Sequence, residues 1–285
     1  MPRGAGDAVT LTRTRINELL GAHGIEPHRG LGQNFVADPN TVRRIARLAG
    51  VGPGDQVVEI GPGLGSLTLA LSDTGARIVA VEADTRLLAV LAEVVDGRDV
   101  TVVSADALEV DWKPVLASAP IWKLVANLPY NVAATIVLHL LDEVPAIDSM
   151  LVMVQREVGE RLAAGPGSKV YGIPSVKLSY WATASVVSRV PASVFIPQPR
   201  VESVLVSVQR RPEPATSADP VRLFSLVRTA FGQRRKMLRR SLASVVDAAT
   251  FAAAGIDPSQ RPEELDVVAW GRLADAVDAA GAPTL

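Results

Sequence analysis

The chain has 285 residues, of which 48% are apolar, 21% are charged and 4% are aromatic. This composition indicates a soluble protein with one large domain, or a large and a small one, and excludes a disordered, collagen-like or disulfide-stapled chain. The chain has no cysteine, which excludes disulfides, thiolate zinc sites and cysteine nucleophiles. The three histidines are scattered, so we expect no metal site.

The sequence carries no targeting or membrane signal. Residues 1–10 lack the apolar stretch of a secretory signal. The most apolar run, 126–141, is interrupted by polar residues and Pro129, and falls short of the roughly 18 to 20 clean residues that a spanning helix needs. We therefore expect a cytoplasmic protein that does not contact membranes.

The net charge of −1 hides segments of opposite sign. Residues 50–150 hold 5 basic and 14 acidic residues, whereas residues 151–240 hold 15 basic and 5 acidic residues. The densest basic run contains Arg234, Arg235, Lys236, Arg239 and Arg240. Such a field attracts phosphate backbones, but a solvated helix face would carry the same charges, and charge alone does not separate the two interpretations.

Short β-branched runs alternate with helical stretches through the first part of the chain. Strands are predicted at 57–60, 77–81, 100–103, 121–126 and 150–154. A helix is predicted at 38–49, where Asp38 precedes a proline at the first helical position. The alternation predicts a parallel sheet with helices on both faces. Two more strands, 184–190 and 201–208, are predicted to close the sheet as a hairpin-like pair.

The later part of the chain predicts a second, smaller domain. Residues 211–220 are rich in proline, alanine and serine, a composition typical of a linker. Residues 221–285 show only helical periodicity. The sequence therefore predicts an α/β domain over 1–210, a linker over 211–220 and an all-helical domain over 221–285.

Three predicted strand ends carry residues suited to a nucleoside ligand. The first strand runs into a loop with Gly61, Gly63 and Gly65, and glycine allows positive φ and a close approach of ligand. Glu82 ends the next strand, 21 residues after Gly61, where an acid accepts from ribose hydroxyls. Asp106 follows the third strand and suits an adenine amino group, although a helix cap is the more frequent role of a single such residue. A dinucleotide and S-adenosylmethionine both fit this pattern.

The fourth strand ends in Asn127-Leu128-Pro129-Tyr130. The Asn127 side-chain oxygen and the Leu128 carbonyl can accept from the two N–H bonds of an exocyclic amine, while Pro129 fixes the turn. Tyr130 can stack on an extruded base. The alternative is an asparagine-capped turn in which Tyr130 only fills the core.

Taken together, these motifs resemble the ribosomal RNA adenine N6,N6-dimethyltransferases, in particular the enzymes that dimethylate two adjacent adenines in the 3′-terminal hairpin of 16S rRNA. The resemblance covers almost the whole chain and includes residues 31–35, 155–158, 166–172, 194–197 and 231–236. It implies a Rossmann-like class I S-adenosylmethionine-dependent methyltransferase domain followed by a small all-helical domain. It also implies that a segment within about residues 1–37 covers the cofactor.

The resemblance further implies roles for individual residues. S-adenosylmethionine would be the methyl donor, with no metal. The cofactor would be lined by Asn34, Val36, Gly61, Gly63, Glu82, Asp106, Ala107 and Asn127. Val36 stands where the family usually has leucine, and a backbone contact tolerates that change. The catalytic group would be Asn127, Leu128, Pro129 and Tyr130, with Phe195 as the second aromatic beside the adenine. Ribosomal RNA would be held by Arg234, Arg235, Lys236, Arg239 and Arg240.

The implied partner is 16S rRNA within the immature 30S ribosomal subunit, and we expect a monomer. Three alternatives remain at this stage. One is a large-subunit rRNA adenine methyltransferase of the macrolide-resistance type, which the match through the carboxy-terminal helices disfavours. Another is a ribosome-assembly factor whose binding role outweighs catalysis. The last is a nicotinamide-dependent dehydrogenase, which leaves the motif at 127–130 unexplained.

Overall fold

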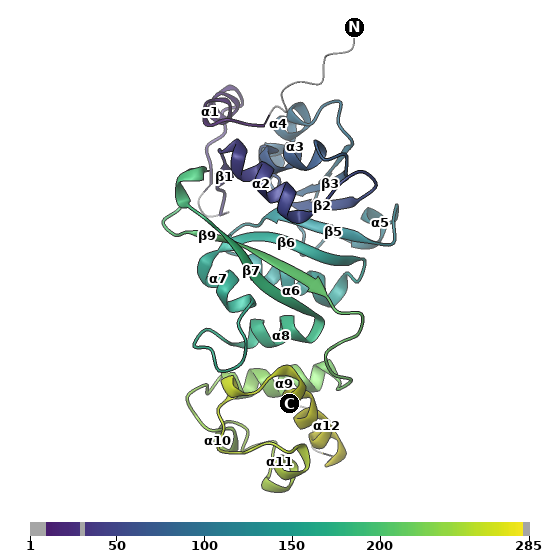
Figure 1. Ribbon diagram of the computed structural model, residues 1–285, viewed down its shortest axis with the longest axis vertical. Coiled ribbons are helices and arrows are strands. Elements are labelled where there is room, and N and C mark those ends of the chain that lie inside the picture. The colour runs from purple at the N-terminus through teal and green to yellow at the C-terminus, as the bar shows by residue number, and fades with distance from the viewer. Residues whose placement is uncertain (1–9, 29–31, 282–285) are drawn as a thin grey trace. The chain divides into compact units, whose positions relative to one another are not determined.

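The computed structural model describes residues 10–28 and 32–281 of the chain (Figure 1). It divides into two compact units. The first, which we call the α/β unit, comprises Met1–Gly159 and Ser185–Gln209; the second, the helical unit, comprises Glu160–Ala184 and Arg210–Leu285. Among the described helices, none combines the length and the apolar character that crossing a bilayer requires.

A seven-stranded sheet in the order β4-β3-β2-β5-β6-β9-β7 dominates the α/β unit. The strands are β2 Gln56–Ile60, β3 Arg77–Glu82, β4 Val100–Ser104, β5 Trp122–Asn127, β6 Ile147–Gln155, β7 Ala182–Val190 and β9 Ser203–Arg210. The pairs from β4 to β6 are parallel, and β6 pairs with β9 in the antiparallel sense. All seven predicted strands are confirmed, with ends shifted by at most three residues, and the last two lie side by side at one edge.

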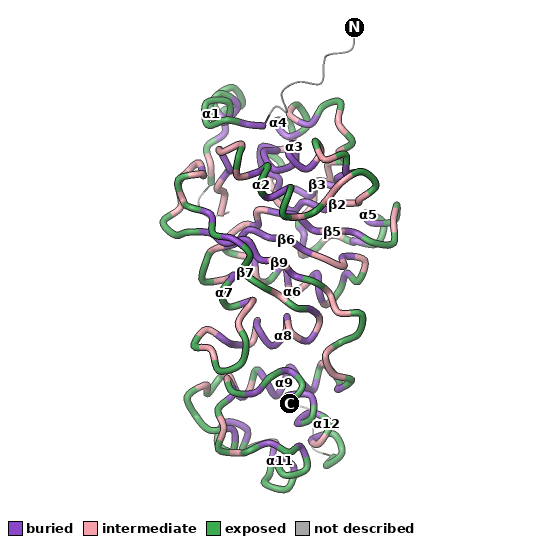
Figure 2. Tube along the Cα trace, viewed as in Figure 1, coloured by how far each residue is buried: buried purple, intermediate pink, exposed green. Residues whose placement is uncertain are grey.

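The central strands are buried, as their apolar, β-branched runs predict. Val57 and Val58 of β2 are inaccessible to solvent, and Figure 2 shows buried segments along β5 and β6. Helices alternate with the strands: α2 Pro39–Ala49, α3 Ser66–Ser72, α4 Leu88–Val94, α5 Trp112–Val115, α6 Ala133–Glu143 and α7 Arg156–Leu162. The alternation explains the continuous apolar runs, because a parallel sheet is covered on both faces.

The helix α2 shows how local signals set an element. The Asp38 side chain accepts from the Thr41 backbone N–H at 3.0 Å, and Pro39 occupies the first turn. The helix ends at Gly50 in the left-handed region with a φ of 59°. Its buried face contains Val42, Ile45 and Ala46. These boundaries and this face agree with the sequence prediction.

The amino-terminal part adds a helix and a short strand that the sequence pattern did not predict. Helix α1 covers Arg13–Ala22 and buries Ile16 and Leu19, within a cluster that also contains Leu64. Strand β1, Phe35–Val36, pairs in the antiparallel sense with β8, Phe195–Ile196. Within residues 10–28 and 32–281, 3₁₀ turns cover Thr85–Leu87, Ala192–Val194 and Pro262–Glu264.

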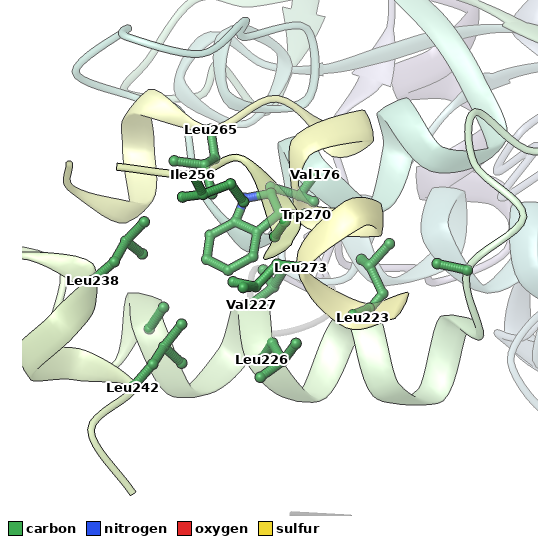
Figure 3. Packing of buried hydrophobic residues seen from close by; sticks show 14 of the residues in the cluster. Val176, Leu223, Leu226, Val227, Leu238, Leu242, Ile256, Leu265, Trp270 and Leu273 are labelled. Carbon is green, nitrogen blue, oxygen red and sulfur yellow. The ribbon is translucent and has the colours of Figure 1, made fainter. Parts of the chain in front are cut away.

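The helical unit contains α8 Ile173–Trp181, α9 Pro220–Phe231, α10 Leu238–Ser241, α11 Ala248–Ala254 and α12 Val267–Ala279. Its core surrounds the inaccessible Trp270 and includes Leu226, Val227 and Leu273 (Figure 3). Every regular element between residues 220 and 281 is helical, as the periodicity predicts.

The boundary between the two units differs from the predicted one. Residues 160–184 belong to the helical unit, because Val176 and Tyr180 of α8 are part of its core. The predicted linker at 211–220 is fastened to that helix: the Ala215 N–H donates to the Tyr180 carbonyl at 2.8 Å, and Ala218 is buried. Residues 211–220 therefore form a packed connection, although their composition is typical of a free linker.

Candidate active site

A pocket of the α/β unit lies where the parallel strands end. One wall is an amino-terminal strap, which we define as residues 32–36, and the others come from the segments that follow β2, β3, β4 and β5. The pocket lining includes all eight predicted cofactor residues, Asn34, Val36, Gly61, Gly63, Glu82, Asp106, Ala107 and Asn127. Positions spread over almost 100 residues are thus brought together at the carboxyl edge of the sheet, where open α/β sheets bind ligands. Of the predicted covering segment, residues 1–9 and 29–31 lie outside the described residues.

The glycine loop permits a close approach of the chain to this pocket. Gly61, Gly63 and Gly65 have φ values of 68°, 59° and 89°. A Cβ on Gly63 would lie 2.9 Å from two ring carbons of Phe35 in the strap. A residue other than glycine at any of the three positions would therefore strain the backbone. At position 63 its side chain would also push the strap away.

Glu82 is held by backbone amides on both of its oxygens. Its Oε2 accepts from the Gly63 N–H at 3.0 Å, and its Oε1 accepts from the Asp84 N–H at 2.9 Å. Burial raises the pKa of Glu82, and these two N–H groups oppose the rise. Each carboxylate oxygen keeps further acceptor capacity, so the group can still take hydroxyl donors from a ligand.

Asp106 caps a turn at the edge of the pocket. Its Oδ1 accepts from the Leu108 N–H at 2.9 Å, which makes it a turn cap, and the residue also lines the pocket. Its neighbour Ala107 is buried.

The Asn127 amide is oriented by the strap. Its Nδ2 donates to the Asn34 backbone carbonyl at 3.0 Å. Its Oδ1 is buried and has no hydrogen-bond partner among the described residues. A buried acceptor without a donor is costly, so this oxygen is suited to receive an N–H from a ligand.

The rest of the motif lies beside this amide. Pro129 lines the pocket, and the Leu128 side chain is buried, with its N–H donating to the Met153 carbonyl. The Tyr130 hydroxyl and the Ser203 hydroxyl are 2.6 Å apart. Burial raises the pKa of Tyr130, and Ser203 opposes the rise. Tyr130 is therefore fixed at its hydroxyl end and remains partly exposed.

The structure places the Phe195 side chain in the hydrophobic core. Its side chain is inaccessible to solvent and belongs to a cluster with Val36 and Ile45. Strand β8, which contains Phe195, pairs with β1 of the strap. In this conformation its ring offers no open face to a base, so the predicted stacking role is not supported.

Arg234 of the basic run is paired within the helical unit. Its Nε forms an ion pair with Glu263 at 2.7 Å, and its Nη2 donates to the Lys169 carbonyl at 2.8 Å. The guanidinium therefore joins segments within the helical unit. The side chains of Arg235, Lys236, Arg239 and Arg240 are exposed.

The pocket lining also contains polar residues that were not predicted as site residues, among them Glu59, Gln33 and Asp84. Glu59 is completely buried, and burial raises its pKa to about 8, opposed by Thr68 and reinforced by Glu82. An acid inside an apolar strand was the signal that could have identified it. Gln33 lies in the 31–35 motif and Asp84 lies two residues after Glu82, and the hydrogen bond between them is a tertiary contact that the sequence does not reveal.

Sheet order, glycine loop and pocket together define a Rossmann-like methyltransferase fold, and solved structures agree. A dimethyladenosine transferase from Plasmodium falciparum matches with a TM-score of 0.73 and 20% identity, over 87% of this chain and 98% of that chain. The 23S rRNA methyltransferase ErmE matches with a TM-score of 0.64 and 28% identity, over 86% of this chain and 100% of that chain. The predicted fold class is confirmed.

The sequence comparison gives the family. A family model described as ribosomal RNA adenine dimethylase matches residues 25–278, and the chain belongs to that family. A relative named ribosomal RNA small subunit methyltransferase A from Leifsonia xyli subsp. xyli is 50% identical over 275 residues, 91% of this chain and 95% of the relative. The protein of the same name from Nocardia farcinica is 49% identical over 284 residues, 94% of this chain and 96% of the relative. The resemblance inferred from the motifs is confirmed.

Proposed function

We propose that this chain uses S-adenosylmethionine to dimethylate N6 of two adjacent adenines in the 3′-terminal hairpin of 16S rRNA, within the immature 30S subunit. Membership of the adenine dimethylase family and the names of the relatives support the reaction and the subunit. The observation that carries the choice of an amine substrate is the buried, unpartnered Oδ1 of Asn127.

The residues of the pocket fit the proposed cofactor. The glycine loop with positive φ gives the backbone room for a ligand, Glu82 offers acceptor capacity for ribose hydroxyls, and Asp106 keeps one oxygen for an adenine amino group. S-adenosylmethionine, when bound, supplies a methyl group that is already activated as a sulfonium. No side chain then has to form a covalent bond with the methyl group.

The remaining task of the protein is to position the amine. Asn127 Oδ1 accepts one N–H of the N6 amino group, and the Leu128 carbonyl accepts the other. These two bonds bend the amino group out of the plane of the ring and expose its lone pair. Tyr130 holds the ring by stacking, so orientation supplies much of the rate. The N6 proton becomes acidic once the nitrogen is methylated and leaves without a strong base.

The same geometry allows a second transfer. A monomethylated adenine keeps one N–H, which needs only one of the two acceptors. The pocket can therefore hold the product of the first round as the substrate of the second.

We assign the RNA contact to the exposed members of the basic run, Arg235, Lys236, Arg239 and Arg240, because phosphate contacts need accessible cations. All predicted residues of the chemical site belong to one α/β unit, which supports action as a monomer. A modification of ribosomal RNA in a bacterial cell takes place in the cytoplasm, and we place the enzyme there.

The Asn127→Ala variant tests this mechanism. We expect it to bind S-adenosylmethionine and to lose single-turnover methyl transfer to unmodified small subunits by at least about 100-fold, because one acceptor that orients the amine is removed. Asn40→Ala, an exposed asparagine on α2, is the matched control and should transfer methyl at the normal rate. Normal transfer by Asn127→Ala would refute the proposed role.

A further inference from the structure

The strap is fastened on both sides of the glycine loop. The Gln33 side chain reaches Asp84, just after β3, and the Asn34 carbonyl reaches Asn127 at the end of β5. In the sheet, β2 lies between β3 and β5, so these two bonds flank the loop that follows β2. The strap therefore crosses the pocket with one polar anchor at each side.

Gln33 uses both ends of its amide. Its Oε1 accepts from the His28 N–H at 2.8 Å, and its Nε2 donates to Asp84 Oδ2 at 2.7 Å. The second bond joins the strap to a different element of the fold. Any opening of the pocket on this side must break it.

The Asp84 carboxylate that accepts this bond is held in place by Arg86. Arg86 donates from Nε to Oδ1 at 2.9 Å and from Nη2 to Oδ2 at 2.6 Å, and the Asp84 side chain is only 8% exposed. The Arg86 guanidinium, assisted by Gln33 and opposed by burial, holds the pKa of Asp84 at about 2. The carboxylate is thus charged at neutral pH, and a hydrogen bond to a charged acceptor is about twice as strong as a neutral one.

The two ends of the strap are held differently. At its carboxyl end, Phe35 and Val36 are buried and paired with β8. At its amino end, Gly32 and Gln33 are partly exposed, and the Gln33 side chain donates to Asp84 in the segment that follows β3. The amino end is therefore the part of the strap that can lift while the β1–β8 pairing stays intact.

We propose that Gln33 is a positioning residue that latches the strap over the cofactor pocket through Asp84 and so sets the rate at which cofactor leaves. The inference rests on the proposed use of S-adenosylmethionine. Because the strap also fixes the Asn127 amide through the Asn34 carbonyl, closing the latch prepares the acceptor oxygen for the substrate amine. Cofactor retention and amine recognition are coupled through one segment.

The test measures the dissociation rate of S-adenosylhomocysteine from the full chain, by displacement with excess unlabelled S-adenosylmethionine in a stopped-flow instrument. Gln33→Ala should dissociate about 10- to 100-fold faster than the wild type, the range for loss of a hydrogen bond to a charged group. Single-turnover transfer at saturating cofactor should change much less, so that KM for the cofactor rises more than kcat falls. Gln198→Ala, an exposed glutamine, should leave the dissociation rate unchanged.

Exchanging the donor and the acceptor of the Gln33–Asp84 hydrogen bond distinguishes the loss of a latch from general damage to the fold. Gln33→Glu places two carboxylates together and should also speed dissociation. Adding Asp84→Asn restores a donor and an acceptor with opposite polarity and should return the rate toward that of the wild type. An unchanged rate in Gln33→Ala, or a double variant as fast as Gln33→Glu, would overturn the latch. If the wild type binds cofactor but does not methylate small subunits, the proposed substrate is wrong. The dissociation rates of the variants would still test the latch in that case.

Discussion

Replacement of Glu59 by glutamine should change how the stability of the α/β unit depends on pH. Burial raises the pKa of this carboxyl from 4.5 to about 8, with Thr68 opposing and Glu82 reinforcing the rise. Folding therefore favours the protonated acid. Its stabilising contribution is complete below about pH 4.5 and is lost progressively as the pH rises through about 8.

The size of the effect follows from this shift. One pKa unit is worth about 1.4 kcal/mol, so a rise from 4.5 to about 8 corresponds to about 5 kcal/mol. About 3 to 4 kcal/mol of this loss falls between pH 5 and pH 8. Glutamine introduces a buried donor that costs about 1 to 3 kcal/mol, but this cost is the same at every pH. The slope, and not the absolute stability, is the diagnostic quantity.

Amide hydrogen exchange in β2 and β5 under increasing urea reports on the α/β unit alone. Between pH 5 and pH 8, the wild type should lose about 3 to 4 kcal/mol of unfolding free energy relative to Glu59→Gln. Glu109→Gln makes the same chemical change at an exposed position and should follow the wild type. Parallel pH profiles for the wild type and Glu59→Gln would refute the assignment of a buried, protonated acid.

Three further predictions follow from the pocket and the basic run. Gly63→Ala should weaken cofactor binding in calorimetry at least about tenfold, because its Cβ would lie 2.9 Å from an aromatic ring of the strap. The control Gly97→Ala, at a position with positive φ but open space around it, should bind cofactor normally, and equal affinities of the two variants would contradict the argument. Tyr130→Phe should keep kcat/KM within a few-fold, whereas Tyr130→Ala should lose about 1 to 3 kcal/mol of base stacking; equal losses would show that stacking is not its role. Charge reversal at Arg235 and Lys236 should weaken RNA binding and flatten its dependence on salt without changing cofactor affinity, and an unchanged salt slope would exclude these residues from the RNA contact.

Local chemistry was enough to predict the sheet and the pocket positions. The short β-branched runs alternating with helical stretches indicate buried strands, and parallel strands bring their carboxyl ends to one edge. The glycine loop, Glu82 and Asn127 could therefore be placed together without coordinates. The resemblance to the family added the strap residues Asn34 and Val36, which lie far from the strands in sequence.

What the sequence could not predict depends on tertiary contacts. The resemblance to the family implies a place for Phe195 beside the substrate, but its burial depends on pairing with a strap about 160 residues earlier in the chain. The basic run does not reveal that Arg234 pairs with Glu263, because the two residues meet only in the folded chain. The predicted linker contained the expected residue types, but Ala218 packs in the helical unit.

The most direct test of the proposed function is transfer of labelled methyl from S-adenosylmethionine to small ribosomal subunits that lack the modification, beside large subunits and free 16S rRNA, with the modified adenines mapped. The account predicts dimethyladenosine at two neighbouring positions of the 3′-terminal hairpin, and only in the small subunit. Label in the large subunit, or binding to small subunits without any transfer of label, would contradict it.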